Sequence, residues 1–283
     1  MGSISLWKFD PGKDDFTAID TQSWQSANSL DEVSEHLPSG VYTTFRTYGK
    51  NKVISLSRHF ERLSESAQLA GQPVEIDIEH LRKIIQKIVL QRSDADLRIR
   101  LTVDLEQAPG TVYITLEPLK TLSPELYVTG CKAKTYRLQR NNPKAKLTRH
   151  IAVARKIRAE YTKDIQEIIT ISSDGAILEG LSSNFFAVKD GMLFTAGEGI
   201  LQGTVRNVVL ELAAAEKIPV SFQSVQISDM PDVDEAFICS TSRAILPLVL
   251  LDEQVVADGH PGEMTNRLMV LYRRWVERHL EAL

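Results

Sequence analysis

Residues 177–191 read ILEGLSSNFFAVKDG, and this stretch carries most weight in deciding the fold. The apolar runs on both sides predict strands, and Asp190-Gly191 is a turn signal of the kind that joins two strands of a hairpin. Between the runs lie one carboxylate, Glu179, and a polar cluster at 182–184, with no Lys or Arg beside the acid. Glu179 is therefore either a solvent-facing carboxylate at a strand end or the partner of a bound group.

The composition bounds the class of protein. With 283 residues, 43% hydrophobic and 25% charged, the chain is long enough for two domains, each with its own core. The net charge of −4 supplies no basic field, so no nucleic acid partner is expected. Cys131 and Cys239 match no metal or redox spacing, which predicts no metal site and suits a reducing compartment. The sequence shows no signal-peptide core and no run of membrane-spanning length, so we expect a cytoplasmic protein without membrane contact.

The first part of the chain alternates between strand and helix patterns. Residues 40–49 are rich in aromatic and β-branched residues and predict a strand, and residues 59–71 have helical spacing that ends at a glycine. A second amphipathic helix is expected at 80–92, followed by two alternating strands near 98–119. These patterns predict a small α/β domain over residues 1–120, with residues 121–125 as the linker.

The second part is richer in strand signals. It begins with an expected strand at 126–137 and a helix at 151–161, continues with two hairpins, and ends in a periodic helix. We expect a larger, barrel-like β domain over residues 126–283 with its helices outside. The predicted fold class is therefore α+β, with helices and strands mixed in two domains.

Three further features could carry chemistry. Gly203-Thr204-Val205 begins a helix, where backbone N–H groups and the helix dipole favour a phosphate, although a plain N-cap explains the same residues. Residues 239–244 read CSTSRA and place hydroxyl groups where an apolar strand ends. Lys146 precedes a periodic helix, where a lysine is ordinarily a solvated charge.

The order and spacing of these features resemble those of fold-type IV pyridoxal-phosphate enzymes. This family includes branched-chain aminotransferases, D-amino-acid aminotransferases and aminodeoxychorismate lyases. The resemblance runs from about residue 40 to 272, through the sequences GVYTTFRTY, HFERL, LEGLSSNFF, DGMLFT, ILQGTVR, DEAFICSTSRAILP and a late GHPGEMT. The resemblance implies a two-domain fold and pyridoxal 5'-phosphate as cofactor.

The resemblance also implies roles for individual residues. Glu179 would pair with the ring nitrogen of the cofactor, whose electron-sink chemistry depends on a proton there. Arg62 would anchor the cofactor phosphate by charge-assisted hydrogen bonds. The remaining cofactor contacts would come from Ser182, Ser183, Asn184, the backbone of Thr204 and Val205, and the hydroxyls of Ser240 and Thr241.

Lys146 is the expected Schiff-base lysine and the catalytic base. Glu179 follows it by 33 residues, a spacing typical of the family, and Arg149 takes the position of a family asparagine. Lys144, two residues earlier, is the alternative.

The substrate contacts are expected on two strands. Tyr42 and Arg46 share one strand face, and Arg98 and Arg100 share another. The resemblance to branched-chain enzymes implies that Arg100 reads the substrate carboxylate, whereas exposed arginines on an edge strand would explain the same pattern. The Arg-Gly step of the D-amino-acid enzymes is replaced by Val103-Asp104.

We therefore expect an aminotransferase that moves an amino group between an amino acid and a 2-oxo acid, with branched-chain L-amino acids as the first substrates to test. An aminodeoxychorismate lyase and a D-amino-acid aminotransferase remain alternatives within the family. A non-catalytic small-molecule binding protein is the alternative from another class. The resemblance also implies a homodimer.

Overall fold

The computed structural model describes residues 4–11, 15–21, 24, 27–92 and 95–283. Contacts divide the chain into two compact units. The first unit contains Met1–Lys120, Ala145–Ile157 and His279–Leu283, and the second contains Thr121–Lys144 and Arg158–Arg278. The sequence-based division assigned the two short segments of the first unit to the larger domain. In the structure these two segments belong to the first unit, because Ala145, Leu147 and Leu283 pack in its hydrophobic core.

The first unit is built on an antiparallel sheet with the strand order β2-β1-β6-β5-β3. Side chains alternate along β3, so that Val41, Thr43 and Phe45 are buried while the residues between them are partly exposed. The sheet is extended beyond β3 by residues 146–148, since Tyr42 N–H donates to the Lys146 carbonyl at 2.9 Å. The strands are β1 (Ser5–Asp10), β2 (Asp15–Ile19), β3 (Gly40–Arg46), β5 (Leu97–Asp104) and β6 (Val112–Pro118).

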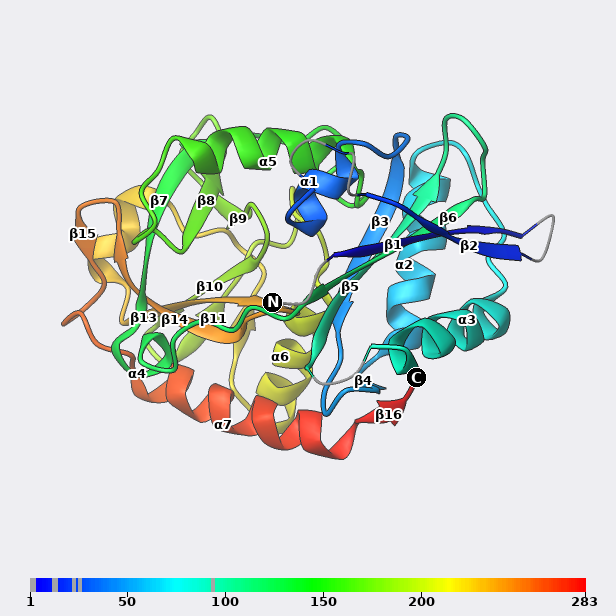
Figure 1. Cartoon of the computed structure of the whole chain (residues 1–283). Coiled ribbons are helices and arrows are strands. Elements are labelled where there is room, and N and C mark those ends of the chain that lie inside the picture. Colours follow the sequence, from blue (N-terminus) through cyan, green and yellow to red (C-terminus); the bar gives the residue numbers. More distant parts are fainter. Residues whose placement is uncertain (1–3, 12–14, 22–23, 25–26, 93–94) are drawn as a thin grey trace. The chain divides into compact units, whose positions relative to one another are not determined.

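Helices flank this sheet (Figure 1). The apolar faces of α2 (Leu56–Leu69) and α3 (Ile78–Leu90) bury their leucine and isoleucine side chains in one core with the sheet. Gly71, at φ 79°, adopts the left-handed conformation just beyond α2, as the sequence predicts. A five-residue helix, α1 (Leu30–Ser34), and a short strand pair complete the unit; the pair joins β4 (Lys52–Val53) to β16 (Glu281–Ala282).

The second unit is a closed β structure. Its path β10-β13-β14-β7-β8-β9 returns to β10 because Glu179 of β9 pairs with Asn184 of β10. This closure confirms the barrel-like sheet expected from the sequence, and it lies within the LEGLSSN stretch. The ring consists of β7 (Cys131–Arg137), β8 (Glu167–Ile171), β9 (Ile177–Gly180), β10 (Asn184–Lys189), β13 (Glu235–Ser240) and β14 (Ala244–Leu251).

The remaining elements of the second unit attach to this ring. Two long helices, α6 (Thr204–Ala215) and α7 (Glu263–Arg278), contact each other and the strands β13 and β14. α5 (Arg149–Ala159) starts in the first unit and ends in the second. The smaller elements are β11 (Met192–Phe194), β12 (Val220–Ser221), β15 (Gln254–Val255), the 3-10 helix Ile227–Asp232 and α4 (Leu126–Thr129).

Two local expectations differ from the structure. The strand expected from residue 126 begins at Cys131, because residues 126–129 form α4 and Gly130 reverses the chain at φ 84°. The pair β1 and β2 and the helix α1 lie in a region to which the sequence analysis assigned no element.

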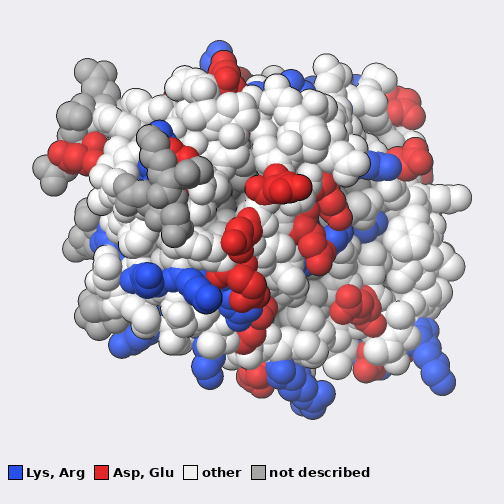
Figure 2. All heavy atoms as spheres, turned by 90° about the vertical axis from the view of Figure 1, so that its right-hand side faces the viewer, with Lys and Arg blue, Asp and Glu red and all other residues white. Residues whose placement is uncertain are grey.

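Charged side chains of both signs occur on the molecular surface. Figure 2 shows a face on which acidic side chains concentrate near the middle, with basic side chains mainly toward the margins. Among the residues described, none of the helices combines the length and apolar character that a bilayer crossing requires.

Candidate active site

Glu179 lies at the closure of the barrel and is 4% exposed. The backbone N–H of Leu201 donates to both of its carboxylate oxygens at 3.2 Å, and Asn184 Nδ2 donates to Oε2 at 3.3 Å. Arg140 forms an ion pair with Oε1. Glu179 is therefore not a solvent-facing strand-end carboxylate.

The ion pair with Arg140 corrects one observation made from the sequence. No basic residue adjoins Glu179 along the chain, but the polar turn after β7 brings Arg140 to it when the barrel closes. The order of residues along the chain cannot reveal such a contact. The RNNP sequence at 140–143 predicts a turn but does not indicate which residue its arginine contacts. The pairing of Glu179 with a cofactor nitrogen remains a prediction.

The start of α6 lies beside the same carboxylate. Asn184 Nδ2 also donates to the Leu201 carbonyl at 2.8 Å, and a Cβ on Gly203 would lie 2.0 Å from Asn184 Oδ1, so this approach requires glycine. Thr204 is 5% exposed, and its Oγ1 has no hydrogen-bond partner within the described part of the chain. The first N–H groups of a helix have no acceptor within the helix. Together with the helix dipole, these donors form a suitable site for an anion.

A second carboxylate, Glu167, organises the neighbouring loop. Ser182 Oγ and Ser183 Oγ donate to its Oε2 at 2.9 and 2.8 Å, and Arg243 Nη2 lies 2.5 Å from the same oxygen. Burial alone would raise the pKa of Glu167, but Arg243 and then Arg158 outweigh burial and hold the pKa at about 2. Glu167 is thus the ionised centre of a buried network.

Arg243 extends this network to the CSTSRA segment. Its Nε donates to Ser240 Oγ at 3.3 Å and its Nη2 donates to Ser182 Oγ at 2.8 Å. Ser240 is therefore linked through one ion pair to Ser182 and Ser183, which lie far from it in the sequence. Thr241 follows Ser240 and is partly buried. The sequence analysis missed both Glu167 and Arg243; the arginine within CSTSRA was the available signal.

Lys146 is fixed to the first unit by its backbone. Its N–H donates to Ser66 Oγ of α2 at 3.1 Å, and its carbonyl accepts from Tyr42 of β3. The side-chain Nζ lies 4.8 Å from the centre of the Tyr42 ring. Lys144 is exposed, whereas Lys146 is partly buried, which supports Lys146 as the reactive lysine.

Two basic residues of α2 are buried near Lys146. His59 shares a 2.8 Å hydrogen bond with Thr43 Oγ1, and its pKa is held well below the usual value by burial and by the charges of Arg62 and Lys146. Burial, with a smaller effect from Arg58, lowers the pKa of Arg62 to about 10. The lowered pKa leaves the His59 ring uncharged, so the buried positive charge here is that of Arg62, which suits an anionic ligand.

The arginines expected to bind substrate lie on paired strands, where Thr44 faces Arg100 and Arg46 faces Arg98. Arg46 pairs with Asp96 at 3.2 Å, and Arg98 pairs with Glu117 at 2.9 Å.

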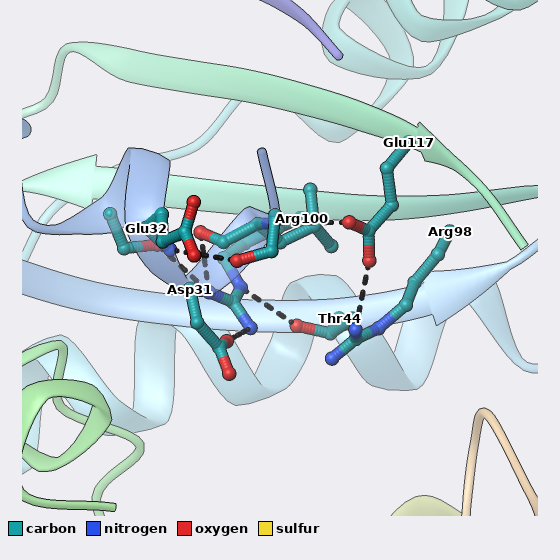
Figure 3. A network of polar contacts seen from close by, with 9 residues as sticks. Asp31, Glu32, Thr44, Arg98, Arg100 and Glu117 are labelled. Carbon is teal, nitrogen blue, oxygen red and sulfur yellow. Dashed lines mark hydrogen bonds and ion pairs between the residues drawn. The ribbon is translucent and has the colours of Figure 1, made fainter. Parts of the chain in front are cut away.

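Arg100 is 3% exposed, and Asp31 of α1 lies 2.7 Å from its Nη2 (Figure 3). Arg100 is therefore not an exposed arginine on an edge strand, because β5 lies between β6 and β3. The carboxylate-reading role of Arg100 remains a prediction.

The expected site residues form two sets, one in each unit. The first unit holds Tyr42, Arg46, Arg62, Arg98, Arg100 and Lys146, and the second holds Glu179, Ser182, Ser183, Asn184, Thr204, Val205, Ser240 and Thr241. Within the described residues, no cluster of His, Cys, Asp and Glu is suited to a metal ion.

Comparisons with known proteins agree with the resemblance seen in the sequence. The family Amino-transferase class IV matches residues 40–251. A probable branched-chain-amino-acid aminotransferase of Thermotoga maritima is 29% identical over 249 residues, which cover 85% of this chain and 87% of the relative. A D-alanine aminotransferase of Staphylococcus epidermidis is 26% identical over 254 residues, covering 85% and 89%.

A solved structure extends the likeness to the whole fold. The branched-chain aminotransferase of Thermoproteus uzoniensis with norvaline superimposes with a TM-score of 0.77 at 26% identity, covering 99% of both chains. The family match spans well over half of this chain. The chain therefore belongs to the class IV aminotransferases.

Proposed function

We propose that this class IV aminotransferase uses pyridoxal 5'-phosphate to move an amino group between a branched-chain L-amino acid and a 2-oxo acid. The observation that carries the proposal is the buried carboxylate of Glu179 beside the N-terminus of α6, whose Thr204 hydroxyl lacks a partner among the described residues. A protein rarely leaves a buried hydroxyl such as that of Thr204 without a hydrogen-bond partner, and a bound ligand would supply one.

The residues fit the parts of this cofactor. Thr204 and the first N–H groups of α6 offer donors for a phosphate, and Arg62 offers a buried cation. Glu179 offers a carboxylate for a protonated ring nitrogen, and Lys146 offers an amine for an aldehyde. When bound, the cofactor supplies an electron sink for the charge left by removal of the substrate α-proton.

The chain's own residues would divide the remaining tasks. Lys146 would take and return the α-proton, which requires its amine to be unprotonated at that moment. Ser66 and Tyr42 fix the backbone of Lys146 and thereby limit where Nζ can reach. The Glu167–Arg243 ion pair would hold the serines of the cofactor-binding loops in place.

The substrate class rests on the relatives. A relative named as a probable branched-chain-amino-acid aminotransferase supports branched-chain amino acids as substrates. Val103-Asp104 replaces the Arg-Gly step that is typical of D-amino-acid aminotransferases. The D-alanine aminotransferase relative keeps D-amino acids as the second candidate. We further propose a cytoplasmic homodimer, which the resemblance of the sequence to this family implies. Light scattering that shows a fully active monomer would contradict the dimer.

Chemical labelling tests the reactive lysine. Borohydride should fix the yellow form of the purified protein, and the labelled peptide should contain Lys146. Label on Lys144 would move the role to that residue. Absence of label from both lysines would refute the pyridoxal-phosphate enzyme.

An absorbance screen of half-reactions tests the substrate. L-Leucine, L-isoleucine and L-valine should convert the cofactor to its aminated form faster than their D-enantiomers do, and 2-oxoglutarate should reverse the conversion. Faster reaction with D-alanine would favour the second candidate. Release of pyruvate from aminodeoxychorismate without amination of the cofactor would identify a lyase.

A further inference from the structure

Arg100 uses all three of its guanidinium nitrogen atoms in hydrogen bonds (Figure 3). Its Nε donates to Thr44 Oγ1 at 3.2 Å, and its Nη1 donates to the Leu30 carbonyl and to Ser34 Oγ at 3.0 and 2.8 Å. Its Nη2 donates to Asp31 Oδ1 at 2.7 Å. The first three acceptors are neutral groups, so Asp31 supplies the negative charge among these four.

Asp31 is also the partner best placed to move. Its side chain is 25% exposed, whereas that of Arg100 is 3% exposed. The adjacent Leu30 is fully buried, and its N–H donates to Glu117 Oε2 at 3.1 Å. Solvent therefore reaches Asp31 but hardly reaches Arg100, and the burial of Leu30 holds α1 independently of the Asp31 side chain. Among the nitrogen atoms of Arg100, Nη2 is thus the one whose acceptor is a charged and partly exposed side chain.

This edge lies near the proposed reactive lysine. Arg100 Cζ is 4.9 Å from the centre of the Tyr42 ring, and Lys146 Nζ is 4.8 Å from the same centre. The two cations therefore share one aromatic neighbour. If the substrate amino group lies at Lys146, the shared Tyr42 ring makes Arg100 a candidate partner for the substrate carboxylate.

We propose that Asp31 is a resident carboxylate that the substrate carboxylate displaces from Nη2 of Arg100. Asp31 thereby determines how tightly the enzyme binds carboxylic ligands. The inference rests on the proposed function, since it requires an amino acid or a 2-oxo acid as substrate. A ligand carboxylate experiences both the attraction of Arg100 and the repulsion of Asp31, whereas a neutral ligand experiences neither to the same degree.

The test compares a charged ligand with its neutral counterpart. Holoenzyme of the parent and of Asp31→Asn is titrated with 4-methylvaleric acid and with its amide, and binding is followed by the visible absorbance of the cofactor. Asparagine keeps an acceptor oxygen for Nη2 but removes the charge. We expect the dissociation constant of the acid to fall about tenfold or more, and that of the amide to change less than about twofold.

A matched variant controls for general charge effects. Glu35→Gln removes the same charge from the exposed residue that follows α1, where Glu35 pairs with Arg155, and should leave both dissociation constants unchanged. Asp31→Ala is the second variant, used if Asp31→Asn melts well below the parent; it should shift the acid in the same direction.

An unchanged or weaker affinity of Asp31→Asn for the acid would overturn the inference, as would an equal shift for the amide. The proposed function is checked before any titration, because a protein without the visible band contradicts that function and removes the basis of the inference. A protein that has the band but shows no Asp31 effect retains the proposed function and refutes the displacement.

Discussion

Glu179 is held by the protein in a fixed orientation before a ligand is considered. Its oxygens are shared among Arg140, Leu201 and Asn184. A buried carboxylate needs partners of this kind, because removing a charge from water is costly. The LEGLSSN motif singled out Glu179 as a cofactor-binding residue. The contact with Arg140 could not be predicted, because it forms only where the closed barrel brings the two residues together.

Glu179→Gln should slow turnover while the protein remains folded and binds its cofactor. Glutamine keeps the shape and an acceptor oxygen, but it gives up a charge-assisted hydrogen bond worth about 1.5–3 kcal/mol. Because about 1.4 kcal/mol corresponds to a factor of ten, turnover should fall roughly 10- to 100-fold or somewhat more. Steady-state kinetics and the visible absorbance measure the two effects separately.

Asp190→Asn is the matched control for Glu179→Gln. Asp190 is exposed and has φ 51°, a conformation that asparagine tolerates, so this variant should turn over at the parent rate. If Glu179→Gln also turns over at the parent rate, Glu179 has no part in the chemistry.

Glu167 should make the protein sensitive to acid. Its pKa lies at about 2 in the folded protein, against an ordinary value of 4.5. A lowered pKa stabilises the folded state above the ordinary value, and this stability is lost as the pH falls from about 4.5 through 2. The contribution at neutral pH is about 3 kcal/mol. Glu167→Gln should therefore lower the melting temperature strongly at pH 7 and progressively less below pH about 4.

An exposed ion pair provides the control for Glu167. Glu253 pairs with Lys134 at 2.6 Å, but its side chain is 93% exposed. Such pairs contribute little to stability, so Glu253→Gln should shift the melting temperature only slightly at any pH. Equal shifts for the two variants would contradict the buried network as the source of the effect.

At the scale of elements, the sequence predicted the helices and strands that have a clear hydrophobic period or a clear turn sequence. The helical spacing of residues 59–71 and 80–92 and the hairpin around Asp190-Gly191 correspond to α2, α3 and the pair β10–β11. α1 has an N-cap, since Ser29 accepts from the Glu32 N–H, but its five residues are too few to show a helical period, and distant groups such as Glu117 hold it in place. The same reason explains why Asp31 was not among the expected site residues.

Thr204→Val, at the N-terminus of α6, should preserve or raise the melting temperature of the cofactor-free protein but weaken its binding of the cofactor. Valine replaces a buried hydroxyl that has no partner among the described residues, which removes a desolvation penalty of about 1–3 kcal/mol. The cofactor-free protein should therefore melt at the same or a higher temperature. Cofactor binding should weaken by about tenfold or more through loss of a hydrogen bond to the phosphate. Calorimetry and a cofactor titration measure the two effects.

Thr265 offers a closely matched control in α7. Its Oγ1 is likewise buried without a partner in the described structure, but the N–H groups at the start of this helix are already bound by Glu235. Thr265→Val should stabilise the protein without changing its affinity for the cofactor. Weakened cofactor binding in both variants would argue against a specific anion site at α6.

At the scale of the whole molecule, the chain passes between the two units several times. Residues 145–157 return to the first unit, where Leu147 packs in the core and Thr148 N–H donates to the Gly40 carbonyl at 2.9 Å. The sequence could not predict this return, because helical and strand patterns report local burial and do not report which core a segment joins. Lys146 therefore belongs to the first unit, whereas Glu179 belongs to the second.

The last residues also return to the first unit, and their removal should destabilise it. β16 pairs with β4, Gln86 Nε2 donates to the Leu283 carbonyl at 2.6 Å, and Leu283 is 4% exposed. Burial of one leucine side chain is worth about 1.5–3 kcal/mol, so deletion of residues 279–283 should lower the free energy of unfolding by at least that amount. Val270→Ala, at an exposed valine of α7, should change stability very little and serves as the control. Denaturant unfolding of the three proteins measures the difference, and a deletion variant as stable as the parent would show that the C-terminal strand does not support the first unit.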